Sequence, residues 1–204
     1  DAAVDAAGGP PTEFGGSRPV RLQVPAGYDP TVPTPLLVVL HGFGASGAVQ
    51  VQYTKLGRLV AAAGILLLAP NGTVNPDGRR FWNATDACCD FYGSGVDDVA
   101  YIVGLVDEVS RVYNVDPRRV VLFGHSNGGF MAYRLACEHP EVFAGLVSLA
   151  GATYLDATIC APVEAVSVLQ IHGTADTVIG YAGGSTCAGC TFPSAVDTVG
   201  TWAA

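Results

Sequence analysis

The clearest pattern in this sequence is Val120-Val121-Leu122-Phe123-Gly124-His125-Ser126-Asn127-Gly128-Gly129-Phe130-Met131-Ala132. Apolar, β-branched residues open it and favour a strand, and good helix formers continue it from Ala132 to Glu138. Between them lies the pentad G-x-S-x-G, which predicts a sharp turn with Ser126 at its apex. Glycines suit such a turn because the start of the helix packs closely against the strand. The pattern therefore predicts an exposed Ser126 hydroxyl above a helix N-terminus, where developing negative charge is stabilised.

The alternation of strands and helices around this turn predicts a parallel α/β sheet. We expect buried strands at 36–40, 65–69, 120–123, 146–149 and 166–171, and an alternating, half-buried strand near a sheet edge at 19–25. We expect helices at 48–63, at 97–113 and from 194 to 204. Ligands bind at the carboxyl ends of such strands, so the loops that follow them should gather at one edge: 41–47, 71–96, 124–128 and 172–184.

Length and composition indicate the number of domains and the kinds of partner that the protein can have. The chain has 204 residues, of which 50% are hydrophobic and 14% are charged, so we expect one domain over 18–204. Residues 1–17 are rich in Ala, Gly and Pro and are expected to form a loose arm. The net charge of −8 argues against a nucleic-acid partner. No apolar run is long enough to span a bilayer, so no membrane partner is expected.

Six cysteines, none at zinc-finger spacing, indicate disulfides in an oxidising compartment. Cys88 and Cys89 are adjacent, so we expect each to pair with a different partner. Cys137 and Cys160 could pair with one another. The C-x-x-C at 187–190 favours a disulfide over a metal or redox site, because no second pair lies at metal spacing. We expect no metal and no cofactor.

The chain begins Asp1-Ala2-Ala3, without Met and without an apolar leader. This start suits a mature exported protein or a trimmed chain. Together with the cysteines, it favours a secreted protein.

A nucleophilic Ser126 needs an acid, a base and hydrogen-bond donors for an oxyanion. Asp176 follows the strand expected at 166–171, where the chain order of nucleophile, acid and histidine would place the acid. The alternative for Asp176 is a turn or helix-capping role. The backbone N–H groups of Asn127 and of Phe43, in the glycine-rich loop after the first central strand, are the expected oxyanion donors.

None of the four histidines is a convincing base. His41 is expected to brace the glycine-rich loop, and His125 is held beside the nucleophile and points away from it. His139 lies at the far end of the helix, about 20 Å from the serine, and His172 orders the loop that it begins. We therefore expect the last strand and its histidine to be missing from these 204 residues.

Five motifs are spread over most of the chain: His41-Gly-Phe-Gly-Ala-Ser-Gly47, Trp82-Asn83 with Cys88-Cys89, Gly95-Val-Asp-Asp-Val99, Gly124-His-Ser-Asn-Gly-Gly-Phe-Met-Ala132 and Ile171-His-Gly-Thr-Ala-Asp176. They resemble motifs of the secreted polyhydroxybutyrate depolymerase-like esterases, which are close to the feruloyl and acetylxylan esterases. The resemblance implies an α/β-hydrolase fold, with Ser126 as nucleophile, Asp176 as triad acid, and Phe43 with Asn127 as oxyanion donors. It also implies a histidine after the last strand, in a segment that this sequence lacks.

The sequence thus predicts a secreted serine esterase that forms an acyl-enzyme on Ser126. Its substrate would be an ester of a hydroxy acid, a hydroxycinnamate, an acetylated sugar or a polyester, including plant cell-wall esters. Phe81, Trp82 and His125 are the candidates for substrate binding, and the alternative for Trp82 is a place in the core. The alternative function is a catalytically inactive hydrolase fold that binds polymer or carbohydrate, and a peptidase or thioesterase is a third. A monomer is expected.

Overall fold

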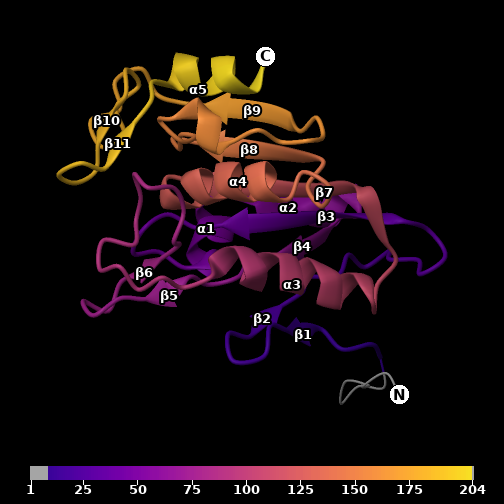
Figure 1. The fold of residues 1–204 in the computed structure, drawn as a ribbon. Helices are drawn as coiled ribbons and strands as arrows, with labels where there is room; N and C mark the ends of the chain where they lie inside the picture. Colours follow the sequence, from indigo (N-terminus) through magenta and orange to yellow (C-terminus); the bar gives the residue numbers. More distant parts are fainter. Residues whose placement is uncertain (1–8, 204) are drawn as a thin grey trace.

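The computed structural model describes residues 9–203 and has a five-stranded parallel sheet at its centre (Figure 1). The strand order is β4-β3-β7-β8-β9. The strands are β3 (Thr34–Leu40), β4 (Leu66–Leu68), β7 (Val115–His125), β8 (Gly145–Leu149) and β9 (Ser167–Ile171). Each pair of neighbours is parallel, which confirms the α/β class expected from the alternation of strands and helices. β3 lies inside the sheet, and its last three residues are fully buried, as its continuous apolar run predicts.

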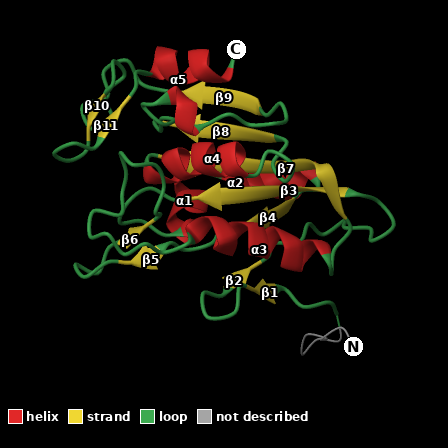
Figure 2. Cartoon of the chain, in the orientation of Figure 1, coloured by secondary structure: helices red, strands yellow, loops and turns green. Residues whose placement is uncertain are grey.

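Helices cover both faces of the sheet (Figure 2). The helices α3 (Asp98–Ser110) and α4 (Asn127–Glu138) lie in front of it in this view, and α1 (Gly47–Thr54) and α2 (Leu56–Ala63) lie behind it. The larger hydrophobic cluster is on the α3 and α4 side, and a smaller one joins α2 to the opposite face. The last helix, α5 (Ala195–Trp202), packs against β9. One 3-10 turn, η1 (Ala157–Ile159), lies between β8 and β9.

One expected helix, 48–63, is two helices. Lys55 ends α1 with a φ of 58° and separates it from α2. The hydroxyl of Thr54 donates to the Gln50 carbonyl oxygen (2.8 Å), which shows that the last turn of α1 bonds locally before the break. Lysine is a good helix former and rarely takes a left-handed conformation. The residue type at position 55 therefore gave no signal of the break.

Three small antiparallel hairpins lie outside the sheet. They are β1 (Glu13–Phe14) with β2 (Val20–Arg21), β5 (Thr73–Val74) with β6 (Arg80–Phe81), and β10 (Gly184–Ser185) with β11 (Thr191–Phe192). The loop 71–96 therefore contains a hairpin. The strand expected at 19–25 is reduced to β2 and a bridge from Gln23 to Leu67 at the β4 edge.

The N-terminal segment differs from the loose arm expected over 1–17. Residues 1–8 lie outside the described residues. Phe14, in contrast, is buried with the core, and the Gly15 N–H donates to the Glu108 carboxylate at 2.8 Å. The difference arises because one buried aromatic ring is enough to attach a segment whose composition is otherwise that of a loop.

The six cysteines form three pairs. Cys137 pairs with Cys160 across 5.5 Å between Cα atoms, as the sequence allowed, and the two cysteines of the C-x-x-C pair with each other. Cys88 pairs with Cys89, so the expectation of two different partners is wrong in this structure. The segment before them folds back on itself, since the Cys89 N–H donates to the Trp82 carbonyl. No helix of the described chain is both long and apolar enough to cross a membrane.

Candidate active site

Ser126 lies between β7 and α4, at the apex of the turn that the pentad predicts. Its φ of 53° and ψ of −120° are a rare conformation for a residue with a side chain. Backbone hydrogen bonds hold it there: its N–H donates to the Leu149 carbonyl of β8 (2.8 Å), and its carbonyl accepts from Gly129 (2.7 Å). No other described residue makes a hydrogen bond to the Ser126 hydroxyl, so this oxygen is available for chemistry.

The glycines of the pentad are required by close backbone contacts. A Cβ on Gly124 would lie 2.0 Å from the Gly128 carbonyl oxygen, and a Cβ on Gly128 would lie 2.2 Å from the Leu40 carbonyl oxygen. Neither space can hold a methyl group. The end of β7, the start of α4 and the end of β3 are therefore in direct backbone contact beneath Ser126.

The loop 41–47 brings a second set of backbone groups to the serine. A Cβ on Gly42 would lie 3.4 Å from the Cβ of Ser126. Phe43 follows, and neither its backbone N–H nor that of Asn127 donates to another group among the described residues. Asn127 is also the first residue of α4, where the helix dipole favours negative charge. The two expected oxyanion donors are therefore unpaired among the described residues, one in the loop beside Ser126 and the other on the residue that follows it.

His41 braces this loop from behind, as its position predicts. Its Nε2 accepts from the Gly72 N–H (2.9 Å), so Nδ1 carries the proton and donates to the Gly42 carbonyl (2.8 Å). Burial lowers the pKa of His41 to about 4, and the nearby positive charges of Arg80 and Arg18 add to this effect. His41 is therefore a neutral, structural imidazole at neutral pH.

Phe81 and Trp82 are buried, which does not agree with the expectation that they stack on substrate. Their exposed fractions are 1% and 0%, and the Trp82 indole N–H donates to the His41 carbonyl at 3.0 Å. Asn127 fixes the backbone of Trp82 through two further hydrogen bonds. The physical reason is that the chain after β6 is bonded to Asn127 at the start of α4, which places both rings in the main hydrophobic cluster. The alternative for Trp82, a place in the core, is the one found.

His125 is half-buried at the rim of the site. Its Nδ1 lies 3.2 Å from the amide oxygen of Gln50 in α1, and its ring stacks on Tyr53 at 5.6 Å. Burial lowers the pKa of His125, and the carboxylate of Asp176 opposes this shift. The His125 ring therefore packs against α1, next to Ser126 in the chain. It remains a candidate for contact with substrate.

Asp176 lies on the loop after β9, at the same edge of the sheet as Ser126. Leu149 of β8 is in register with both His125 of β7 and Ile171 of β9. The turn that holds Ser126 and the loop that holds Asp176 therefore begin at strands with one strand between them, about 10 Å apart. One Asp176 oxygen accepts from the N–H groups of Val178 (2.8 Å) and Ile179 (3.0 Å). The other makes only a 3.9 Å approach to His172. One oxygen of Asp176 therefore stabilises the turn, and the other can still accept a hydrogen bond.

His172 orders the same loop. Its Nε2 donates to the Ile179 carbonyl (2.7 Å), and its Nδ1 accepts from the side chain of Gln170 (3.1 Å). Both ring nitrogens are therefore used. The remaining histidine, His139, contacts Glu141 beyond the end of α4. No imidazole of the described residues is hydrogen-bonded to Ser126, as the sequence led us to expect.

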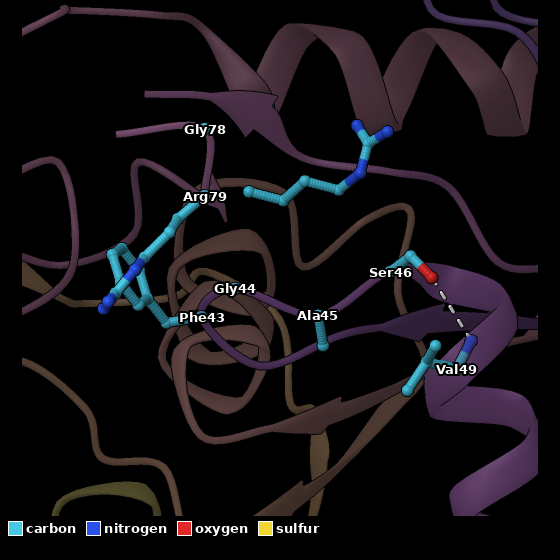
Figure 3. Close-up of a pocket in the computed structure, with 8 residues that line it drawn as sticks. Phe43, Gly44, Ala45, Ser46, Val49, Gly78 and Arg79 are labelled. Atoms are coloured by element: carbon cyan, nitrogen blue, oxygen red, sulfur yellow. Dashed lines mark hydrogen bonds between the residues drawn. The ribbon is translucent and has the colours of Figure 1, made fainter. Parts of the chain in front are cut away.

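Two features of the site were missed by sequence reasoning. The first is the ion pair of Arg18 with the buried Asp98 (2.7 Å), which also anchors both ends of the loop segment 71–83. The second is a pocket of about 650 Å³ beside Phe43 (Figure 3). It is lined by Phe43, Gly44, Ala45, Ser46, Val49, Gly78, Arg79 and Arg80. Two adjacent arginines in a chain with only ten basic residues were the available signal for it.

The described residues contain no group of three His, Cys, Asp or Glu side chains that could hold a metal ion. The groups that this edge of the sheet presents are the Ser126 hydroxyl, the unpaired backbone N–H groups of Asn127 and Phe43, and the Asp176 carboxylate. Together with the parallel sheet and the strand–serine–helix turn, this arrangement defines an α/β hydrolase.

The chain belongs to the phospholipase/carboxylesterase family, whose model matches residues 29–191. A relative from Nocardia uniformis subsp. tsuyamanensis that carries the name of an esterase, NocK, is 35% identical over 84% of this chain and 49% of its own length. Feruloyl esterase B of Piromyces equi is 26% identical over 82% of this chain and 31% of its own. Poly(3-hydroxyalkanoate) depolymerase C of Paucimonas lemoignei is 29% identical over 70% of this chain and 34% of its own length.

The fold is also that of solved esterases. A carboxylesterase from Mesorhizobium loti superposes with a TM-score of 0.63 at 21% identity, covering 83% of this chain and 79% of that one. This chain spans about half or less of the length of the curated relatives named above.

Proposed function

We propose that the protein is a secreted serine carboxylic-ester hydrolase that works through an acyl-enzyme on Ser126. The observation that carries the proposal is the Ser126 hydroxyl, which has no hydrogen-bond partner among the described residues and lies in a strand–serine–helix turn beside the glycine-rich loop 41–47. In the first step, the Ser126 oxygen bonds to the ester carbonyl carbon, its proton passes through a base to the leaving alcohol, and the alcohol departs. Water then attacks the acyl-enzyme and releases the acid and the free serine.

The oxyanion formed in both steps would accept hydrogen bonds from Phe43 N–H and Asn127 N–H, each of which is typically worth about 100- to 1000-fold in rate. Asp176 would hold and orient the base. We propose that this base is a histidine outside the 204 residues, since all four imidazoles of the chain are engaged elsewhere. The lengths of the relatives and the single unengaged oxygen of Asp176 support this proposal.

The substrate class follows the relatives: an ester of a hydroxycinnamate, of a hydroxy acid or polyester, or an acetylated sugar. Secretion is supported by the three cysteine pairs, which are typical of proteins in oxidising compartments. We expect a monomer.

The test is labelling with a fluorophosphonate, followed by intact mass, on the 204-residue chain and on the full-length gene product. A single adduct on the full-length product that is absent from Ser126→Ala supports the proposal, as does loss of ester hydrolysis in that variant. Ester hydrolysis that survives Ser126→Ala overturns it. Comparison of ester, thioester and amide substrates separates an esterase from a thioesterase or a peptidase.

One observation favours a second function, a binding protein without catalysis: no described imidazole reaches Ser126. This alternative predicts retention of the full-length protein on polymer or polysaccharide without turnover. A fluorophosphonate adduct on Ser126 would contradict it, because that reaction needs an activated serine.

A further inference from the structure

The pocket beside Phe43 has a chemical character of its own. Phe43, whose N–H is the proposed oxyanion donor, forms one wall, and Arg79 lies alongside its ring with 6.0 Å between guanidinium and ring centroid (Figure 3). Gly42, the residue before Phe43, has its Cβ position 3.4 Å from the Cβ of Ser126, so the pocket lies beside the loop that flanks the serine.

Positive charge in this pocket is not neutralised by the protein. Neither Arg79 nor Arg80 forms an ion pair with a carboxylate of the described residues, whereas five other arginines do: Arg18, Arg111, Arg118, Arg119 and Arg134. The acid of the same hairpin turn, Asp77, accepts a hydrogen bond from the Tyr92 hydroxyl. Arg79 and Arg80 are adjacent in sequence, and the hydrogen bond that the Arg80 guanidinium makes is to a backbone carbonyl, that of Gly72 (3.4 Å).

The start of α1 adds to this charge. Ser46 caps the helix by accepting from the Val49 N–H, and both residues line the pocket (Figure 3). The first turn of α1 contains no acidic residue. The positive end of the helix dipole therefore faces the pocket without a compensating carboxylate.

We propose that Arg79, Arg80 and the N-terminus of α1 form a subsite for a carboxylate, so that the preferred esters carry a free carboxylate near the scissile bond. Such esters include the half-esters of dicarboxylic acids and the acid end of a hydroxy-acid oligomer. Guanidinium groups suit this task because they form paired, charge-assisted hydrogen bonds to carboxylates. The inference rests on the proposed esterase function and names its substrate class.

The test compares matched esters that differ only in charge. Mono-4-nitrophenyl adipate is paired with the 4-nitrophenyl ester of adipic monoamide, and 4-butanoyloxybenzoate with 4-butanoyloxybenzamide, which places the charge on the acyl or on the alcohol side. We expect the full-length protein to prefer the carboxylate in one pair by about tenfold or more in kcat/KM, the worth of one charge-assisted hydrogen bond. The preference should fall as salt rises.

The variants Arg79→Gln, Arg80→Gln and their double should remove this preference, which is read as the ratio of kcat/KM for the carboxylate ester to kcat/KM for its neutral partner within each variant. Arg58→Gln is the matched control, because Arg58 is an exposed arginine of α2 without an ion pair. It should leave the preference for the carboxylate unchanged. Equal rates for charged and neutral esters in both pairs, or a preference that survives the double variant, overturn the proposal.

A binding measurement separates this inference from the proposed function. Titration calorimetry of Ser126→Ala with mono-4-nitrophenyl adipate and with its monoamide partner, at low salt, reads the subsite without catalysis. Tighter binding of the carboxylate that is lost in the arginine double variant supports the subsite, whether or not esters are hydrolysed. Equal binding of the two compounds overturns the subsite and leaves the esterase proposal standing.

Discussion

The side chain of Asn127 and the backbone of Trp82 exchange two hydrogen bonds: Trp82 N–H donates to Asn127 Oδ1 at 2.8 Å, and Asn127 Nδ2 donates to the Trp82 carbonyl at 3.0 Å. Both residues are fully buried. The residue that follows the nucleophile thus has two tasks, because its backbone N–H faces the proposed oxyanion site and its side chain fastens the loop 71–96 to α4.

Asn127→Ala is expected to lower the free energy of unfolding by about 3 kcal/mol, because it leaves the N–H and the carbonyl of Trp82 buried without partners. Asn127→Asp keeps the acceptor for Trp82 N–H but loses the donor, so it should retain part of the stability. Urea unfolding measures both. Asn114→Ala, which removes one exposed hydrogen bond to Pro30, is the control and should cost less than about 1 kcal/mol. Equal losses in Asn127→Ala and Asn114→Ala would contradict the pairing.

Gly42→Ala should separate activity from stability. Its methyl group would lie 3.4 Å from the Cβ of Ser126 and from the His125 carbonyl oxygen, a contact that the fold can accommodate with little movement. We expect a change in unfolding free energy within about 1 kcal/mol, together with at least a tenfold loss of ester hydrolysis in the full-length protein. Full activity would show that the space beside Ser126 is not used by substrate.

Gly128→Ala should instead prevent stable folding, since its methyl group would collide with the backbone of β3 at 2.2 Å. A cost of more than about 3 kcal/mol is the expected result of such overpacking. Gly104→Ala is the matched control, because this glycine lies within α3 and has open space around its Cβ position. That change should stabilise the protein by up to about 1 kcal/mol, which thermal or urea unfolding can measure.

His41 should make the protein less stable in mild acid. Its pKa is about 4 in the folded protein, below the ordinary histidine value of 6.5, so the unfolded chain takes up a proton that the folded protein does not bind. Stability from this residue is complete above pH 6.5 and is lost as the pH falls toward 4, by up to about 3 kcal/mol. His41→Gln, which can still accept from Gly72 N–H, should show a weaker pH dependence in urea unfolding.

Arg18→Ala should destabilise the protein by about 3 kcal/mol, because it leaves the fully buried Asp98 without its guanidinium partner. Burial already raises the pKa of Asp98, and loss of Arg18 would raise it further. The penalty should therefore be smallest in acid, where Asp98 is protonated, and should grow as the pH rises through its folded pKa. Adding Asp98→Asn should restore part of the loss. Arg118→Ala, whose side chain is 91% exposed, should be neutral.

The order of strands and helices and the serine turn could be predicted because both depend on local sequence. The pentad requires glycine at positions 124 and 128, where the structure has close backbone contacts. A continuous apolar run predicts β3. The break at Lys55 could not be predicted, because lysine is a good helix former and its residue type does not indicate a left-handed conformation.

The rest of the site depends on contacts between distant residues. A tryptophan suits both a core and a binding surface. The burial of Trp82 follows from its hydrogen bonds to Asn127, which is 45 residues away in the sequence. Arg18 and Asp98 are 80 residues apart, so no spacing in the sequence indicates their ion pair. The pocket arginines were visible as an adjacent pair, but their lack of acidic partners is a property of the folded chain.

β9 has consequences for how the protein behaves at high concentration. No described strand pairs with its outer edge, and Leu169 and Ile171 on it are 54% and 46% exposed. An open edge with apolar side chains is a template for another strand, so two molecules brought together could extend one sheet into the other. The net charge of −8 keeps them apart by repulsion that salt screens. Moderate salt should therefore promote precipitation of this chain rather than dissolve it.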